Sequence, residues 1–208
     1  MACGPDVIFI GGWLAGSYDA LSQIAPVVYL ATDSDLGVVE SVRQNTRAIA
    51  SLFGLEDTAG ELMTGFDSRV AALASFSEGR TAIVWAWLPA AASMCWATTA
   101  SRSLIGREAG FANVGADAQP GTSTHGNEAS FEFLVDKDPD YLFVLDRDAA
   151  IGTDGAKLAQ EVVENELMKG TAAYRDGRIV YLAHPAVWYT AEGGITALDR
   201  MLRDLEDP

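Results

Sequence analysis

Short apolar segments of strand length alternate along this chain with segments of helical spacing. The run Asp140-Tyr-Leu-Phe-Val-Leu145 is almost entirely apolar, which is typical of a strand buried on both faces in a parallel sheet. Similar runs lie at Val7–Ile10, Val27–Leu30, Thr81–Leu88 and Ile179–Leu182. Because strands that alternate with helices are joined by crossover connections, the pattern predicts an α/β fold built on parallel strands.

Two long helical patterns separate the first two strands from the others. The first covers Asp35–Phe53 and ends before Gly54, and the second covers Glu56–Phe76 with apolar side chains on one face. A helix of this second length spans about 30 Å. Shorter helices are predicted at Tyr18–Ile24, from near Ser101, and at Glu128–Val135, Gly155–Lys169 and Glu192–Leu205.

Composition limits the function classes. With 208 residues and 49% apolar content, the chain can bury a substantial core in one large domain or two small lobes. Its net charge of −15, from 29 acidic and 14 basic residues, argues against nucleic acid or anionic lipid as the main partner. A small ligand or a basic protein surface fits better, although acidity can also serve solubility alone.

The two cysteines do not form a recognisable site. Cys3 and Cys95 are too few for a disulfide scaffold and lack the paired spacing of a zinc site. Cys95 is predicted to be a small core residue. No hydrophobic signal segment precedes Cys3, and no apolar run is long enough to span a bilayer. We therefore expect that any export leader is absent from this sequence.

Three chemically unusual groups are predicted to lie on loops that follow strands. They are Thr124-His-Gly126, Asp146-Arg-Asp148 and Trp188-Tyr189. Arg147 comes directly after the Asp140 strand, at the edge where open α/β sheets bind ligands. Each group also has a simpler interpretation: His125 is incidental, Arg147 is neutralised by its two neighbours, and Trp188 and Tyr189 pack against each other.

No enzyme motif stands out. The chain has no Gly-x-Ser-x-Gly elbow, Walker loop, His-Glu-x-x-His zinc motif or glycine fingerprint after the first strand. Its carboxylates include no pair that is marked out as an acid and a base. A binding protein is therefore the simpler hypothesis than an enzyme, with no intrinsic cofactor expected.

Several segments together resemble the class III periplasmic binding proteins of iron-siderophore importers, in the subgroup that handles catecholate or petrobactin-type ligands. They are Pro5-Asp-Val-Ile-Phe-Ile10, Gly121-Thr-Ser-Thr-His-Gly126, Pro139-Asp-Tyr-Leu-Phe-Val-Leu-Asp-Arg147, Arg178-Ile-Val-Tyr-Leu182 and Trp188-Tyr-Thr-Ala-Glu-Gly-Gly194. The resemblance covers nearly the whole chain but only about the last two thirds of the family's usual length. It implies two Rossmann-like lobes with parallel sheets, joined by a long helix, with the first lobe incomplete.

The resemblance also implies the domain boundaries and the metal ligands. Residues 1–55 would form the partial first lobe, 56–78 the connecting helix, and 79–208 the second lobe. His125 and Tyr189 match the residues that bind ferric iron in this subgroup. A tetradentate chelator leaves two of the six positions on Fe(III) open, and an imidazole and a phenolate can fill them.

Basic and aromatic ligand contacts follow from the same comparison. Arg147 matches an arginine that binds the anionic catecholate oxygens, and Arg102 matches a second one, with Arg107 as a rival. Trp13 stands where a siderophore-binding relative would have arginine, so the ligand is expected to be less anionic or more aromatic than a plain ferric catecholate. Trp188 is expected beside the ligand, Trp85, Trp87 and Trp96 in the core, and His184 in a structural role.

The leading hypothesis is capture of a ferric siderophore and its delivery to the permease of an ABC importer, in the periplasm or outside the cytoplasmic membrane. Nucleic acid is not expected as a partner. One alternative is a truncated or divergent relative that acts as an interaction module, as a homo-oligomer that covers the open edges of the first lobe. Another is a binder of haem or a different metal chelate, with Tyr189 as the iron ligand.

Overall fold

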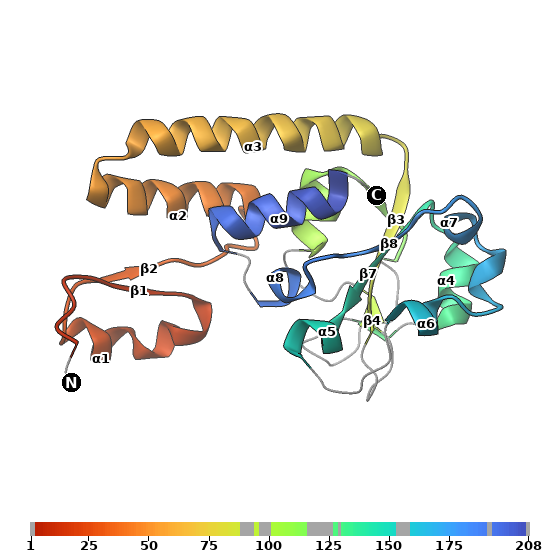
Figure 1. The fold of residues 1–208 in the computed structure, drawn as a ribbon, viewed down its shortest axis with the longest axis horizontal. Helices are drawn as coiled ribbons and strands as arrows, with labels where there is room; N and C mark the ends of the chain where they lie inside the picture. The colour runs from red at the N-terminus through yellow and green to blue at the C-terminus, as the bar shows by residue number, and fades with distance from the viewer. Residues whose placement is uncertain are drawn as a thin grey trace.

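The computed structural model describes residues 3–87, 94–95, 101–115, 127–128, 130–152, 159–190 and 193–206. A small parallel strand pair and a larger sheet lie at opposite ends of the molecule, with long helices between and above them (Figure 1). The predicted α/β fold with parallel strands is confirmed. None of the helices in the described ranges is long and apolar enough to cross a lipid bilayer.

The first unit contains strands β1, Ile8–Ile10, and β2, Val27–Tyr29. They pair in parallel, with Phe9 opposite Val28. A 3-10 helix, η1 (Gly12–Ser17), and helix α1 (Tyr18–Ser22) connect them. Helix α1 lies within the predicted helix at Tyr18–Ile24. No other described strand pairs with either of these two.

Two long helices follow, α2 (Val38–Phe53) and α3 (Glu56–Ser77), and they lie side by side (Figure 1). Helix α2 begins three residues later than predicted because the Asp33 carboxylate accepts hydrogen bonds from the backbone N–H groups of Asp35 and Leu36, which holds the preceding loop in a turn. It ends as predicted at Gly54, whose φ of 65° is in the left-handed region. The 22 residues of α3 span about 33 Å.

The larger sheet is built on three parallel strands, β3 (Thr81–Trp87), β7 (Tyr141–Asp146) and β8 (Ile179–Tyr181), with β7 in the middle. Strand β5 (Ala112–Asn113) adds a short parallel pairing to β3. Two short antiparallel strands, β4 (Met94–Cys95) and β6 (Asn127–Glu128), extend the sheet beyond β3, with β4 paired to β3 and β6 paired to β4. They were not predicted.

Helices surround the larger sheet, and several differ from their predicted bounds. In chain order they are the π-helix η2 (Ser101–Glu108), α4 (Phe131–Lys137), α5 (Arg147–Ile151), α6 (Ala159–Val163), the 3-10 helix η3 (Met168–Gly170), α7 (Ala172–Arg175), α8 (Pro185–Thr190) and α9 (Ile195–Glu206). Helix α4 starts at Phe131 rather than Glu128, because Glu128 pairs with β4 and the Ser130 side chain caps the helix by accepting from the Phe133 N–H.

The prediction of one continuous helix over Gly155–Lys169 is wrong in its described part. Helix α6 ends at Val163, and the chain then turns before η3. The side-chain oxygen of Asn165 accepts from the backbone N–H groups of Leu167 and Met168, which satisfies these donors locally and replaces helical bonds. An asparagine in a helical pattern was the signal for this break.

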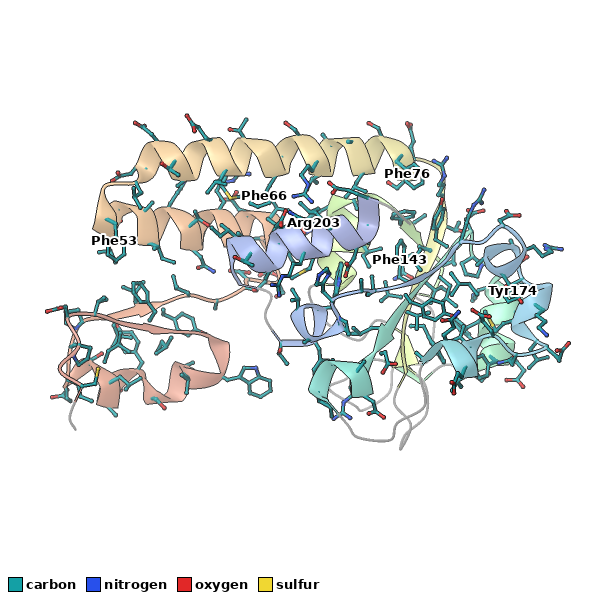
Figure 2. The ribbon with its side chains drawn as sticks, in the orientation of Figure 1. Phe53, Phe66, Phe76, Phe143, Tyr174 and Arg203 are labelled. Carbon is teal, nitrogen blue, oxygen red and sulfur yellow. The ribbon has the colours of Figure 1, made fainter. Side chains whose placement is uncertain are left out.

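The main core lies around β7 and extends to the packed faces of α2, α3 and α9. Figure 2 shows Phe143 within the larger sheet and Phe66 on the side of α3 that faces α2 and α9. Phe143 is fully buried and packs against Phe111, with ring centroids 5.2 Å apart. Trp85 is buried too, as predicted, whereas the side chain of Trp87 and all of Trp96 lie outside the described part.

Candidate ligand-binding site

Arg147 and Tyr189 are brought together although 42 residues separate them in the sequence. The Nε of Arg147 donates a hydrogen bond to the Tyr189 hydroxyl at 3.0 Å, and its guanidinium carbon lies 5.6 Å from the centre of the Tyr189 ring. Both residues were predicted to lie on loops, but the structure places them in helices. Arg147 is the first residue of α5, and Tyr189 lies near the end of α8.

The position of Arg147 follows from the way β7 ends. Asp146 is the N-cap of α5, where one carboxylate oxygen accepts from the Ala149 N–H and the other from the Ala159 N–H, both at 2.9 Å. The Asp146 carboxylate is therefore engaged by backbone donors of two helices. This favours a role for Arg147 at the strand edge over simple neutralisation by Asp146.

Helix α8 is held in place by Asp204, a buried carboxylate on α9. One oxygen of Asp204 lies 2.7 Å from the Nδ1 of His184, and the other accepts from the His184 backbone N–H at 3.0 Å and from the Trp188 indole N–H at 2.8 Å. His184 therefore has a structural role, as predicted. Bonds to a buried carboxylate are charge-assisted, so they determine the orientation of α8 strongly.

Trp188 occupies a different position from the one expected for a ligand contact. Its side chain is fully buried, and its only polar group is bonded to Asp204. Successive residues of a helix point about 100° apart, so Trp188 packs into the core while Tyr189 points toward Arg147. In this structure Trp188 has no surface for a ligand and serves to anchor α8.

A cavity of about 500 Å³ lies between the first unit and the end of α8. Residues 11–14 and 29–32 form one side, and Thr190 and Gly193 form the other. Trp13 is fully exposed on the first side, and Thr190 follows Tyr189 directly. The cavity is therefore lined by the predicted ligand contact Trp13 on one side and by the neighbour of Tyr189 on the other.

Asn45 connects the two sides of this cavity through hydrogen bonds. Its buried side-chain amide donates to the Ala31 carbonyl at 3.2 Å and to the Gly193 carbonyl at 3.1 Å, and both of these residues line the cavity. Neither Asn45 nor Asp204 was predicted from the sequence. Each is a polar residue on the apolar face of an amphipathic helix, and this pattern could have identified them.

The other predicted residues are described less completely. His125 lies outside the described ranges, and only the backbone of Arg102 is described, in η2. Its rival Arg107 donates to the Asp35 carbonyl at 3.0 Å. The adjacent Glu108 accepts from the backbone N–H groups of Val38 and Val39 at the start of α2. Arg107 and Glu108 thus connect η2 to the α2 end of the molecule.

A second tyrosine at the same sheet edge makes a useful contrast with Tyr189. Tyr181 ends β8, and burial, reinforced by the nearby Glu164 carboxylate, raises its pKa well above the ordinary value. Its hydroxyl donates to the Glu164 carboxylate at 3.4 Å, so a carboxylate rather than a guanidinium lies beside it. Tyr181 is therefore a natural control for Tyr189.

Other hollows lie away from these residues. One of about 640 Å³ lies between α3 and α9, where Arg69 forms ion pairs with Asp199 and Glu206. It contains none of the predicted ligand contacts. Within the described ranges there is also no cluster of three or more His, Cys, Asp or Glu side chains that could hold a metal ion by itself.

Comparison with known proteins agrees with this arrangement. Residues 1–186 match the model of the family described as periplasmic binding protein. The chain belongs to this family. The resemblance inferred from the sequence motifs is thereby confirmed at the level of the family.

Two curated relatives have names that state what they bind. The chain is 31% identical over 210 residues to the petrobactin-binding protein YclQ of Bacillus subtilis, and this match covers 98% of the chain and 62% of YclQ. It is 24% identical over 215 residues to the ferric-anguibactin-binding protein FatB of Vibrio anguillarum, which covers 98% of the chain and 63% of FatB. The chain thus spans less than two thirds of the length of these curated relatives.

The fold is also similar to solved structures of the family. The crystal structure of the periplasmic catecholate-siderophore binding protein VctP from Vibrio cholerae superposes with a TM-score of 0.87 at 28% identity. This match covers 99% of the present chain and 72% of VctP. The arrangement of the chain's elements is therefore similar to that of this solved structure.

Proposed function

We propose that this chain captures a ferric siderophore of the catecholate type and passes it to the membrane permease of an ABC importer, as a carrier without catalytic activity. The observation that carries the proposal is the contact between Arg147 and Tyr189 at the edge of the larger sheet, beside a cavity that both halves of the chain line. Membership of the periplasmic binding protein family and relatives that bind petrobactin and ferric anguibactin support it.

Tyr189 and His125 would complete the coordination of the iron. Fe(III) enters as part of the cargo, and a tetradentate chelator leaves two positions open for a phenolate oxygen and an imidazole nitrogen. The contact with Arg147 fixes the direction of the Tyr189 hydroxyl before the ligand arrives. When the phenol gives up its proton to solvent and binds the iron, the guanidinium beside it balances part of the negative charge.

Arg147 and Arg102 would hold the anionic oxygens of the chelate, and Trp13 would contact its organic part. Trp188 acts indirectly in this proposal, because it anchors the helix that carries Tyr189. We keep the division into a first lobe of residues 1–55, a connecting helix of 56–78 and a second lobe of 79–208. A stiff connector such as α3 favours a small closing motion. The proposed location is outside the cytoplasmic membrane.

The test is a titration of the chain with a ferric bis-catecholate chelate, followed by quenching of tryptophan fluorescence. Saturable quenching is expected for the natural chain, and affinity should fall about 10- to 100-fold in Tyr189→Phe and in His125→Ala. Tyr181→Phe removes the same hydroxyl at the same sheet edge and should leave affinity unchanged. Flat titrations, or equal losses in Tyr189→Phe and Tyr181→Phe, would contradict the proposal.

Two other hypotheses give different results in simple measurements. A haem binder would show a Soret band on loading, whereas a ferric catecholate shows a broad visible charge-transfer band. An interaction module that acts as a homo-oligomer would show a molar mass that rises with concentration in light scattering. A monomer that binds the ferric chelate would favour the carrier over both.

A further inference from the structure

The described lining of the cavity between the first unit and α8 is uncharged. None of its ten described residues is Asp, Glu, Lys, Arg or His. On one side the fully exposed indole of Trp13 and the half-exposed ring of Tyr29 offer aromatic surface. On the other side, the Thr190 hydroxyl already donates to the Ala186 carbonyl within α8. The described parts of the walls thus offer aromatic contact and no charged side chain.

The net charge of the chain points the same way. The whole chain carries a net charge of −15, so its long-range field disfavours strongly anionic ligands. A chelate with several uncompensated negative charges would therefore find little compensation on the cavity side of the site.

We propose that Trp13 and this neutral cavity select ferric chelates of low net charge that carry an additional uncharged aromatic ring, which packs on the Trp13 indole. This inference rests on the proposed function and specifies its substrate class. Aromatic rings pack favourably in offset or edge-to-face arrangements beyond the area that they bury, and a chelate with such a ring gains that contact here. A carboxylate in the same place would lose hydration without gaining a partner.

The experiment compares three ferric bis-catecholate chelates that differ only in the linker between the two catechols. One linker is a plain alkyl chain, one carries a phenyl ring, and one carries a carboxylate. Binding is measured by equilibrium dialysis of the iron, so the readout does not depend on tryptophan emission. For the natural chain we expect the phenyl chelate to bind about tenfold more tightly than the alkyl chelate, and the carboxylate chelate to bind most weakly.

Variants of Trp13 separate ring contact from charge. Trp13→Phe should keep the preference for the phenyl chelate, and Trp13→Ala should remove it. Trp13→Arg should remove it and also improve binding of the carboxylate chelate about three- to tenfold. Ile24→Arg is the matched control, because it adds the same charge to an exposed position of the first unit that does not line the cavity. It should preserve the order of the natural chain.

The outcomes distinguish this inference from the proposed function. If the three chelates bind equally and Trp13→Arg changes nothing, iron-chelate capture stands and the role of Trp13 is refuted. The same holds if Ile24→Arg acts like Trp13→Arg, since net charge alone would then explain the effect. If none of the chelates binds to any variant, the proposed function fails, and the inference fails with it.

Discussion

The two sheets of this protein use similar strand sequences and reach very different degrees of burial. Strand β1 is as apolar as β7, yet Phe9 in its centre is 40% exposed, while Phe143 in the centre of β7 is fully buried. In the described part of the chain, β7 pairs on both sides and β1 only with β2. The comparison shows that burial is decided by the neighbours a strand acquires, not by its own apolar content.

The two regions are connected by polar contacts as well as by α3. Asn45 bonds to carbonyls at both ends of the cavity, and Glu108 accepts from the first N–H groups of α2. These groups come from helices that contact the larger core and reach the loops of the first unit. These bonds therefore help to hold the loop that follows β2 against α2 and the segment after α8.

The largest expected effect is a difference in the free energy of unfolding between two variants, each of which removes the phenylalanine at the centre of one strand. Phe143→Ala removes a fully buried ring and should lower the free energy of unfolding by about 3–5 kcal/mol. Phe9→Ala should lower it by less than about 1.5 kcal/mol, because the ring is partly in water already. Urea unfolding followed by circular dichroism measures both. Equal losses would show that β1 contributes to the core as much as β7 does.

A smaller effect is expected from breaking the polar connection between the regions. Asn45→Ala leaves the Ala31 and Gly193 carbonyls without their amide donor, so unfolding should become easier by about 2 kcal/mol. Hydrogen exchange at residues 29–32 should become faster. Gln44→Ala changes the adjacent, exposed amide of the same helix and should cost less than about 0.5 kcal/mol. Similar costs for the two variants would mean that Asn45 does not connect the regions.

The smallest effect is a pH dependence confined to the larger sheet. Asp140 accepts from the backbone N–H and the hydroxyl of Thr81 at the start of β3, and these bonds, the backbone one foremost, lower its pKa. A carboxyl whose pKa is lower in the folded state stabilises the fold above its unfolded-state pKa, about 4, and this contribution is lost as pH falls through the folded-state pKa.

Asp140→Asn should therefore be less stable than the natural chain at pH 7, and the difference should shrink below about pH 4. Thermal unfolding measured across this range checks the prediction. Asp136→Asn, at an exposed position, is the control. Its stability difference from the natural chain should not change with pH in this way. A difference between natural chain and Asp140→Asn that persists unchanged into acid would rule out the Thr81 contact as its cause.

Much of the architecture could be predicted from local sequence patterns. The parallel strands β3, β7 and β8 and the long helix α3 appear close to their predicted bounds, because the apolar repeat of a strand or a helix lies within a short window. The predictions that failed involve side chains that form hydrogen bonds with nearby backbone N–H groups and so change where a helix begins or ends. Ser130 begins a helix later than the apolar pattern suggests, and Asn165 interrupts one.

The sequence alone determined the fold class, the strand that delivers Arg147 to the carboxyl edge of the sheet, and the family to which the motifs belong. Only the tertiary structure decided that Tyr189 contacts Arg147 while Trp188 turns inward to Asp204, and that Asn45 bonds to two residues that line the cavity beside Trp13. The physical reason is the separation in sequence between the residues that interact. Periodicity is set by neighbouring residues, whereas these contacts join segments far apart in the chain, and their geometry depends on how whole helices pack.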